Sequence, residues 1–340
     1  FRRARVQARQ IYVYGQAAAL GWNGPWKHLI ETGVQALYSA YLKSDGTART
    51  MLTAAGAPLD ETSMIYDQAF VMLSLATTSA AGLSDATLED RAVRLRDILV
   101  ASAMTNGAMR EHGEHPFQSN AHMHLLEASL AWEEAGADAG WATFSDRVVA
   151  LAAKHFIDAD GGFLREFFDE GWRPAPGEDG RLVEPGHQFE WAWLLARYSV
   201  ARQNPDALTM AKRLYEAGLH GVSERSRIAC DSLNDDFSVR SSRARLWPQT
   251  EWLKASLILA EQSHDAERVQ YLKHAAEAQR ALAVYLTADG LWHDKRLPSG
   301  EFVDEPAPAS SFYHIMAAYQ QLVRTGHACG LPGLTALSLA

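Results

Sequence analysis

The sequence predicts an all-α protein, an (α/α)6 barrel formed by residues 1–340 as one domain, with short β-hairpins in its loops. Three observations support this fold class. Apolar residues at three- and four-residue spacing dominate the chain and indicate long helices. Strand-like alternation is confined to short pieces between these helices. Five of the helices begin with related polar and aromatic motifs, repeated with a period of about 60 residues.

Eleven helices are expected along the chain. The first covers residues 4–20, and five pairs follow: 26–43 with 64–80, 89–105 with 120–135, 143–157 with 186–202, 206–222 with 247–262, and 265–286 with 311–324. Antiparallel pairs bury their apolar faces by stacking on neighbours, and a closed ring leaves no exposed end. Because an (α/α)6 barrel has six pairs, we expect a further helix before Phe1. An open α-solenoid is the alternative.

The loops between the paired helices resemble one another. Three of them read "SDGTARTMLTAAGAPLDE", "DADGGFLREFFDEGWRPAPGEDGRLVE" and "TADGLWHDKRLPSGEFVDEPAPA". Each begins with a Gly turn, continues with a few extended residues and turns again near a second Gly, which indicates a β-hairpin. Since all these loops enter alternate helices from one end, they favour a closed ring with a pocket at that end.

Composition and charge exclude several function classes. A net charge of −9 argues against nucleic acid or an anionic membrane as a partner. We find no apolar run of about 18 residues, so no transmembrane helix is expected. Two cysteines in 340 residues fit a reducing compartment, and we expect a cytoplasmic protein. Phosphate-binding glycine patterns and Gly-x-Ser-x-Gly motifs are absent.

The helix starts carry the candidate chemistry. His124, His187 and His314 lie in the first two turns of three helices, at what we interpret as equivalent points of the repeat. The positive end of a helix disfavours an imidazolium, so a histidine there is expected to stay neutral near pH 7 and act as a base. Each histidine alone could also be a satisfied core or capping residue. A metal is not expected, because His122 and His124 point roughly 200° apart on a helix.

Further polar and aromatic side chains near these starts could bind a sugar. Glu190 and Glu251 could accept hydrogen bonds from sugar hydroxyls, orient a catalytic imidazole, or form salt bridges with Arg243 or Arg245. Trp247 could belong to the core or stack on a sugar ring. We interpret these residues as a pocket in which histidines carry out acid–base chemistry and the other groups bind hydroxyls. This interpretation accounts for most of them.

Six motifs resemble the N-acylglucosamine 2-epimerase superfamily: "QARQIYVYGQA", "YDQAFVMLSLA", "NAHMHLLEA", "PGHQFEWAWLL", "RLWPQTEWLKA" and "PASSFYHI". They occur in the family's order and spacing and cover nearly the whole chain. The resemblance implies an (α/α)6 barrel that needs no metal or cofactor. It implies His187 and His314 as the principal catalytic residues and His124 as a third conserved histidine. It further implies six substrate-binding residues: Arg9, Tyr66, Asn120, Glu190, Trp247 and Glu251.

Within that family, "PASSFYHI", "WPQTEW" and "YDQAFV" are most similar to the D-mannose isomerases. We therefore expect interconversion of D-mannose and D-fructose through an enediolate. His314 would move the proton between C2 and C1, and His187, oriented by Glu190, would serve the oxygens. Arg9 would stabilise their developing negative charge. The free sugar is preferred because no cluster of Arg and Lys marks a phosphate site.

Several alternatives remain open at this stage. They are a 2-epimerase of the N-acylglucosamine or cellobiose type, a mannose-6-phosphate isomerase, an inverting glycoside hydrolase using Asp67, Glu190 or Glu251 on the same barrel, and a catalytically silent sugar-binding protein. The expected partner is a monosaccharide, and the expected assembly is a monomer or a homodimer.

Overall fold

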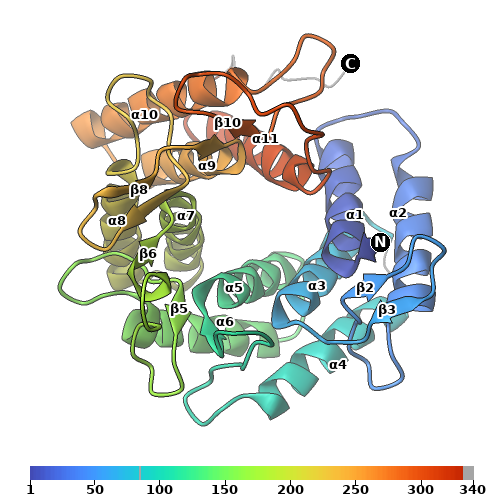
Figure 1. Cartoon of the computed structure of the whole chain (residues 1–340). Helices are drawn as coiled ribbons and strands as arrows, with labels where there is room; N and C mark the ends of the chain where they lie inside the picture. Colours follow the sequence, from blue (N-terminus) through green and yellow to red (C-terminus); the bar gives the residue numbers. More distant parts are fainter. Residues whose placement is uncertain (84–85, 332–340) are drawn as a thin grey trace. The chain divides into compact units, whose positions relative to one another are not determined.

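The computed structural model describes residues 1–83 and 86–331, and helices dominate these residues (Figure 1). The α-helices in the described residues are α1 (Ala4–Ala19), α2 (Trp26–Ala36), α3 (Ile65–Ala80), α4 (Ala86–Ser102), α5 (Ser119–Glu134), α6 (Gly140–Leu151), α7 (Pro185–Arg202), α8 (Pro205–Leu219), α9 (Trp247–Glu261), α10 (Asp265–Ala283) and α11 (Ser311–Ala328). Short π-helical turns extend α2 and α6, at Leu37–Tyr41 and Ala152–Phe156. The eleven expected helices are therefore confirmed.

Short antiparallel strands occupy the loops that precede α3, α5, α7, α9 and α11. They form a sheet of β1 (Arg2–Arg3), β2 (Met51–Leu52) and β3 (Pro58–Asp60), a pair of β4 (Phe117–Gln118) and β5 (Phe167–Phe168), a sheet of β6 (Leu182–Val183), β7 (Ser232–Asn234) and β8 (Val239–Ser241), and a pair of β9 (Ala244–Arg245) and β10 (Lys295–Arg296). The expected hairpins are confirmed as short strands that connect the ends of neighbouring repeats.

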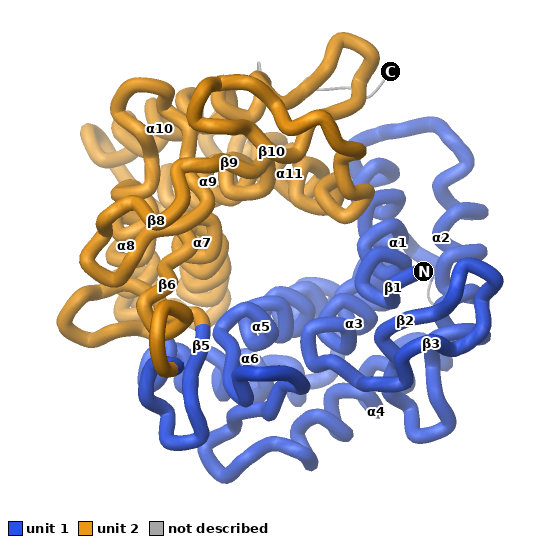
Figure 2. Tube along the Cα trace, viewed as in Figure 1, with its two compact units in different colours: residues 1–156, 167–175, 338–340 blue, residues 157–166, 176–337 orange. Residues whose placement is uncertain are grey.

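The chain divides into two compact units (Figure 2). The described part of the first unit comprises residues 1–83, 86–156 and 167–175, and that of the second comprises residues 157–166 and 176–331. In the first unit, α1, α3 and α5 pack side by side, and α2, α4 and α6 each cover one of them. In the second, α7, α9 and α11 form the corresponding row, with α8 on α7 and α10 on α9.

The expected helix pairs are wrong by one helix. Each hairpin begins with a helix of the row and returns through its covering helix, so that α1 pairs with α2 and α9 with α10. The expected pair 26–43 with 64–80 corresponds to α2 and α3, which do not form such a pair. The connections explain this result: short turns close α7–α8 and α9–α10, whereas long decorated loops lead to the next row helix. Short connections favour antiparallel neighbours in direct contact.

A repeated side chain attaches the decorated loops to the row helices. The Gln68 carboxamide on α3 accepts a hydrogen bond from the Ala48 N–H (2.7 Å) and donates to the Ala48 carbonyl (2.9 Å). Gln188 on α7 forms the same two bonds with Leu164, at 2.8 and 3.0 Å. Gln249 on α9 forms them with Ala229, at 2.9 and 2.8 Å. All three carboxamides are buried, so each one satisfies loop backbone groups that water cannot reach.

None of the described helices is both long enough and apolar enough to span a lipid bilayer. The row helices are instead buried around most of their circumference; in α7, for example, residues 185–196 are all buried. Polar residues on such helices are therefore either hydrogen-bonded within the protein or directed at a site.

Candidate active site

His187 lies at the start of α7, where the loop chain turns into the helix. Pro185 is the first helical residue, a position at which proline needs no N–H partner and has a suitable φ. His187 follows in the first turn and is 8% exposed. Its Nδ1 lies 2.9 Å from Glu166 Oε2 and 2.9 Å from Glu184 Oε2. A hairpin carboxylate and the residue preceding the helix therefore hold the same ring nitrogen.

These two carboxylates determine the charge of His187. Burial alone would lower the pKa of the imidazole, but Glu166 and Glu184 raise that pKa well above its usual value. Burial would likewise raise the pKa of Glu184, yet His187 and Arg245 lower it to about 2. The expectation that the helix start keeps His187 neutral is therefore wrong. Two adjacent carboxylates outweigh both the helix terminus and desolvation, and the imidazolium is favoured at pH 7.

Glu190 does not orient His187, which corrects a second expectation. Within the described residues, the hydrogen-bonding partners of His187 are Glu166 and Glu184, whereas Glu190 lies one turn further along α7. Side chains on a helix lean toward its N-terminus, so a histidine in the first turn reaches back to residue i−3 rather than forward to i+3. Glu190 is grouped instead with Glu251 and His314, with carboxylate and imidazole atoms within 4.8 Å of one another.

Arg245 on β9 links the His187 group to the neighbouring loop. Its Nη2 lies 3.1 Å from Glu184 Oε1, and its Nε lies 3.0 Å from Asp231 Oδ1. The guanidinium is also stacked over the ring of Trp247, 5.3 Å from its centre. Arg245 therefore forms salt bridges, as one alternative had it, but with Glu184 and Asp231 rather than with Glu190 or Glu251.

Trp247 begins α9 and contacts both catalytic candidates of the second unit. Its ring centre lies 5.1 Å from that of His187 and 5.7 Å from that of His314. Gly186 permits this approach, because a Cβ at that position would lie 2.3 Å from the Trp247 ring. The indole is half-buried, so part of an aromatic face stays open beside two imidazoles.

His314 on α11 is held by a carboxylate on α9. Its Nδ1 lies 2.8 Å from Glu251 Oε1, and the imidazole is 7% exposed. Glu251 Oε2 is in turn 2.6 Å from Lys254 Nζ, and neither of these side chains is exposed. Of the roles considered for Glu251, orienting an imidazole is the one that this contact supports. The contact engages Nδ1, which fixes the orientation of the imidazole ring.

The first unit carries its own group of predicted site residues. Arg9 Nη2 on α1 donates to Tyr66 Oη on α3 at 2.7 Å, and the guanidinium lies 4.1 Å from the centre of the Phe70 ring. The His124 ring on α5 meets Tyr66 edge-on, with centres 5.0 Å apart. His124 Nδ1 lies 3.0 Å from Glu127 Oε2, one helical turn further along. A cation, a phenol and a carboxylate-bound imidazole are thus brought together.

Asn120 is half-buried in the first turn of α5, and its side-chain oxygen has no hydrogen-bond partner among the described residues. This group is therefore available to a ligand. His122 differs completely. Its Nδ1–H donates to the Gln118 carbonyl (2.8 Å), and its Nε2 accepts from the Met109 N–H (3.1 Å). Burial lowers the pKa of His122 to about 4, which fixes it as a neutral structural residue.

The three candidate histidines do not occupy equivalent positions, contrary to the expectation. His187 is the third residue of α7, His314 the fourth of α11 and His124 the sixth of α5. The repeated position, fourth in α3, α5 and α7, holds the loop-binding side chains Gln68, His122 and Gln188. The repeated spacing therefore reflects loop-binding side chains in α3, α5 and α7, whereas in α11 the fourth position holds the candidate His314.

Two sets of residues in the second unit have the composition of a metal site: Glu166, Glu184 and His187, and Glu190, Glu251 and His314. Hydrogen bonds and ion pairs already engage His187 in the first set, and Glu251 and His314 in the second. His187 Nδ1 is shared by Glu166 and Glu184, and Lys254 places a positive charge on Glu251. A cation in either place would displace these pairs, so the donor sets fit proton transfer better than metal binding.

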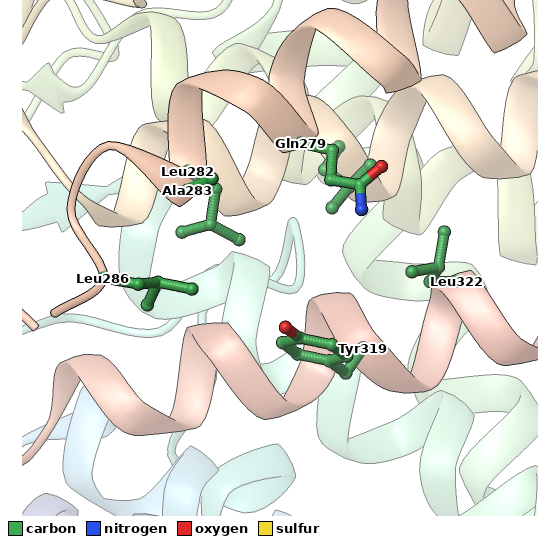
Figure 3. Close-up of a pocket in the computed structure, with 7 residues that line it drawn as sticks. Gln279, Leu282, Ala283, Leu286, Tyr319 and Leu322 are labelled. Atoms are coloured by element: carbon green, nitrogen blue, oxygen red, sulfur yellow. The ribbon is translucent and has the colours of Figure 1, made fainter. Parts of the chain in front are cut away.

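Two hollows of the second unit lie among other residues. An apolar cavity of about 70 Å³ is lined by Leu253 of α9, by Gln279, Leu282 and Ala283 of α10 with Leu286 beyond it, and by Tyr319 and Leu322 of α11 (Figure 3). A larger hollow of about 670 Å³ lies between the loop after α8 and the β10 hairpin. Neither is lined by a predicted site residue.

Sequence reasoning missed the carboxylates and the lysine that control the histidines. Glu127 and Lys254 each lie three residues from a site residue on the same helix, and Glu184 lies three residues before His187 at the N-cap of α7, a spacing that could have identified them. Glu166 could not have been found in this way, because it lies 21 residues before His187 on a hairpin that tertiary structure brings back.

Asp67, a candidate acid in the glycoside hydrolase alternative, has a structural role. It is buried on α3, its Oδ2 accepts from Thr50 Oγ1 at 2.6 Å, and its Oδ1 lies 2.8 Å from Arg5 Nε. Burial raises the pKa of Asp67, although Arg5 opposes this effect. The carboxylate therefore connects α3 to the loop before β2, through Thr50, and to α1, through Arg5.

Comparisons with known proteins show what this chain is similar to. Residues 1–318 match the model of the N-acylglucosamine 2-epimerase family. The chain is 43% identical over 330 residues to a mannose-6-phosphate isomerase of Rhizobium meliloti, which covers 94% of this chain and 85% of that protein. It is 26% identical over 280 residues to a D-mannose isomerase of Thermobifida fusca, covering 74% and 66% of the two chains.

Among solved structures, cellobiose 2-epimerase from Spirochaeta thermophila is similar with a TM-score of 0.84. Its sequence is 19% identical, and the match covers 96% of this chain and 86% of the epimerase. The likeness shows the fold, which is the (α/α)6 class that the helical repeat predicts.

Proposed function

Because the chain is an isomerase that belongs to the N-acylglucosamine 2-epimerase family, we propose that it interconverts a mannose-configured aldose and its ketose. The observation that carries this proposal is the pair of imidazoles that contact Trp247 in different electrostatic surroundings. His187 faces two carboxylates, whereas the Glu251 carboxylate bonded to His314 also pairs with a lysine. Unequal surroundings give two like groups different pKa values, so that one can act as an acid and the other as a base.

The chemistry of an aldose requires both functions. The C2 hydrogen is acidic only in the open-chain form, where the C1 carbonyl accepts the electrons and gives an enediolate. His314, through Nε2, removes the C2 proton while the His187 imidazolium protonates O1. His314 then returns the proton to C1, and His187 accepts the proton of O2 as the ketone forms. Protons and electrons balance without a cofactor, and each imidazole ends in its starting state.

In the first unit, we propose that Arg9, Tyr66, Asn120 and His124 bind the sugar's oxygens. Arg9 supplies a buried positive charge suited to an oxygen that becomes negative, and its guanidinium is fixed by Tyr66 and Phe70. In the second unit, we propose Trp247 as the surface on which the sugar stacks, and Glu190 and Glu251 as groups that act beside His314.

Mannose 6-phosphate becomes the first substrate to test. The 43% identical relative is named for the phosphorylated sugar, whereas free D-mannose, preferred on sequence motifs, is the sugar in the name of the 26% identical relative. Both relatives are named for isomerisation of a mannose-configured aldose. A phosphate would affect only how the enzyme binds the sugar at C6, because proton transfer takes place at C1 and C2.

Incubation with mannose 6-phosphate or mannose in D2O, followed by NMR, tests the reaction. The corresponding fructose product is expected, with deuterium at C1 only in the fraction of turnovers in which the proton held by His314 exchanges with solvent. A glucose-configured product would contradict the proposal and identify a 2-epimerase. That alternative is the activity named in the family description and in the name of the similar solved structure.

Substitution tests the residues. We expect His187→Ala and His314→Ala each to lower kcat by about 10²- to 10⁴-fold with the fold retained. His327→Ala, at an exposed position near the end of α11, is the matched control and should keep full activity. An active His187→Ala/His314→Ala double variant would overturn the mechanism.

A further inference from the structure

The second unit contains a buried lysine that the proposed mechanism does not use. Lys254 and Glu251 lie one turn apart on α9, with Nζ 2.6 Å from Oε2 and no exposure of either side chain. The ammonium also lies 3.9 Å from the centre of the Trp193 ring on α7. Burying an ammonium is costly unless it is paired. The ion pair with Glu251 therefore has to offset a large desolvation penalty at Lys254.

Three row helices fix the position of this ammonium. Trp193 comes from α7, and its Nε1 donates to Gln321 Oε1 on α11 at 2.8 Å, which holds the ring in place. Glu251 comes from α9 and bonds through its other oxygen, Oε1, to His314 Nδ1 on α11. One carboxylate thus joins Lys254 to His314, with a separate oxygen for each partner.

Among the described residues of the second unit, Glu251 and Lys254 from α9 and Glu190 from α7 lie near His314. A carboxylate beside an imidazole favours the imidazolium, as it does for His187. A cation on the same carboxylate offsets that effect, because it stabilises the negative charge without help from the histidine. His314 therefore retains an orienting acceptor at Nδ1 without the full pull toward the protonated form.

We propose that Lys254 is a positioning residue for the base of this reaction. It holds Glu251 ionised and turned so that His314 carries its proton on Nδ1 and donates it in a hydrogen bond to this carboxylate. This inference rests on the proposed function, which needs a base at C2. It explains why the two histidines differ in protonation state. Lys254 pairs with the carboxylate that is bonded to His314, whereas two carboxylates contact one nitrogen of His187.

Lys254→Met tests this role, because methionine retains the length of the side chain and removes its charge. With Glu251 unneutralised, the imidazolium of His314 is stabilised, so a larger fraction of the base is protonated at pH 7. We expect kcat at pH 7 to fall by up to about tenfold and KM to stay within about threefold. The acidic limb of the kcat–pH profile should move up by about one pH unit, with activity recovering at higher pH.

Lys273→Met, at an exposed position on α10, is the matched control and should leave both kinetic constants unchanged. A Lys254→Met enzyme that loses thermal stability but keeps the wild-type kcat and pH profile would show a merely structural lysine and overturn the inference.

A measurement on the wild-type protein decides the question even where Lys254→Met does not fold. Nitrogen-15 NMR of histidine-labelled protein, with His314→Gln to assign the signals, reports which ring nitrogen is protonated. We expect the neutral Nδ1–H form of His314 at pH 7, and an imidazolium or an Nε2–H form would contradict the inference. The spectrum does not depend on turnover, so an inactive protein with the expected tautomer would count against the proposed function alone.

Discussion

At the scale of single residues, neighbouring charges determine what each histidine can do. His187, His314 and His122 all lie in first helical turns, yet their surroundings differ. His187 is bonded to two carboxylates, His314 to a carboxylate shared with a lysine, and His122 to a backbone carbonyl and a backbone N–H. The helix terminus is common to all three, so the partners decide the protonation state.

The carboxylates of His187 provide a pH prediction. Because the folded protein raises the pKa of His187, the imidazolium stabilises the fold at pH values below about 6.5. That contribution is lost as pH rises through the raised pKa. We expect Glu166→Gln to lower this pKa and to move the alkaline limb of the kcat–pH profile down by about one unit or more.

Kinetics over a pH series measure this change. Glu267→Gln, which removes an exposed carboxylate on α10, should leave the limb in place. An alkaline limb that stays unchanged in Glu166→Gln would argue that His187 does not act as the acid.

At the scale of elements, the loops are built to carry reacting groups to the row helices. The hairpin of residues 157–166 delivers Glu166 to His187, and Gln188 fixes that hairpin through both backbone groups of Leu164. Strand β9 presents Arg245 to Glu184 in a similar way. The loop-binding Gln188 and the proposed catalytic residue His187 are adjacent in α7, so loop attachment and histidine orientation depend on the same helical turn.

Gln188→Leu tests this coupling. The substitution leaves a buried N–H and a buried carbonyl of Leu164 unsatisfied, and we expect the free energy of unfolding to fall by about 2–4 kcal/mol. Because Glu166 moves with the hairpin, kcat should fall as well. Chemical denaturation and steady-state kinetics measure the two effects, and Gln270→Leu, at an exposed position of α10, should change neither. A destabilised variant with full kcat would show that the hairpin does not position Glu166.

At the scale of the whole chain, each unit carries a row of helices and a histidine held by carboxylates. His124 with Glu127 belongs to the first unit, and His187 and His314 with their glutamates belong to the second. Each repeated hairpin contributes a helix N-terminus, and the side chains at these N-termini differ from one repeat to the next. One fold can therefore carry several kinds of reactive group.

This chemistry predicts an enzyme that works without a metal ion. The hydrogen bonds at His187 and the salt bridge of Lys254 occupy the atoms that a metal would need. We expect prolonged dialysis against EDTA to leave kcat unchanged within about twofold, with residual metal measured by elemental analysis. Loss of activity on dialysis, and its return with a divalent cation, would contradict the proton-transfer mechanism.

Much of the fold could be predicted because helical periodicity is a local property. The predicted helix 186–202 corresponds to Pro185–Arg202, and 247–262 corresponds to Trp247–Glu261. The pairing of helices could not be read in the same way, because it depends on contacts across loops. Of the candidate site, the structure joins His187 and His314 through Trp247, and Arg9 and His124 through Tyr66.

The sequence by itself determined the helices, the repeat and the residues that can transfer protons, since spacing along one helix is enough to place a side chain on its face. Tertiary structure decided which groups face those residues. It placed Glu166 on His187 across 21 residues and Glu251 on His314 across 63. The charge of an imidazole depends on atoms within a few ångströms, and folding, rather than sequence distance, decides which atoms those are.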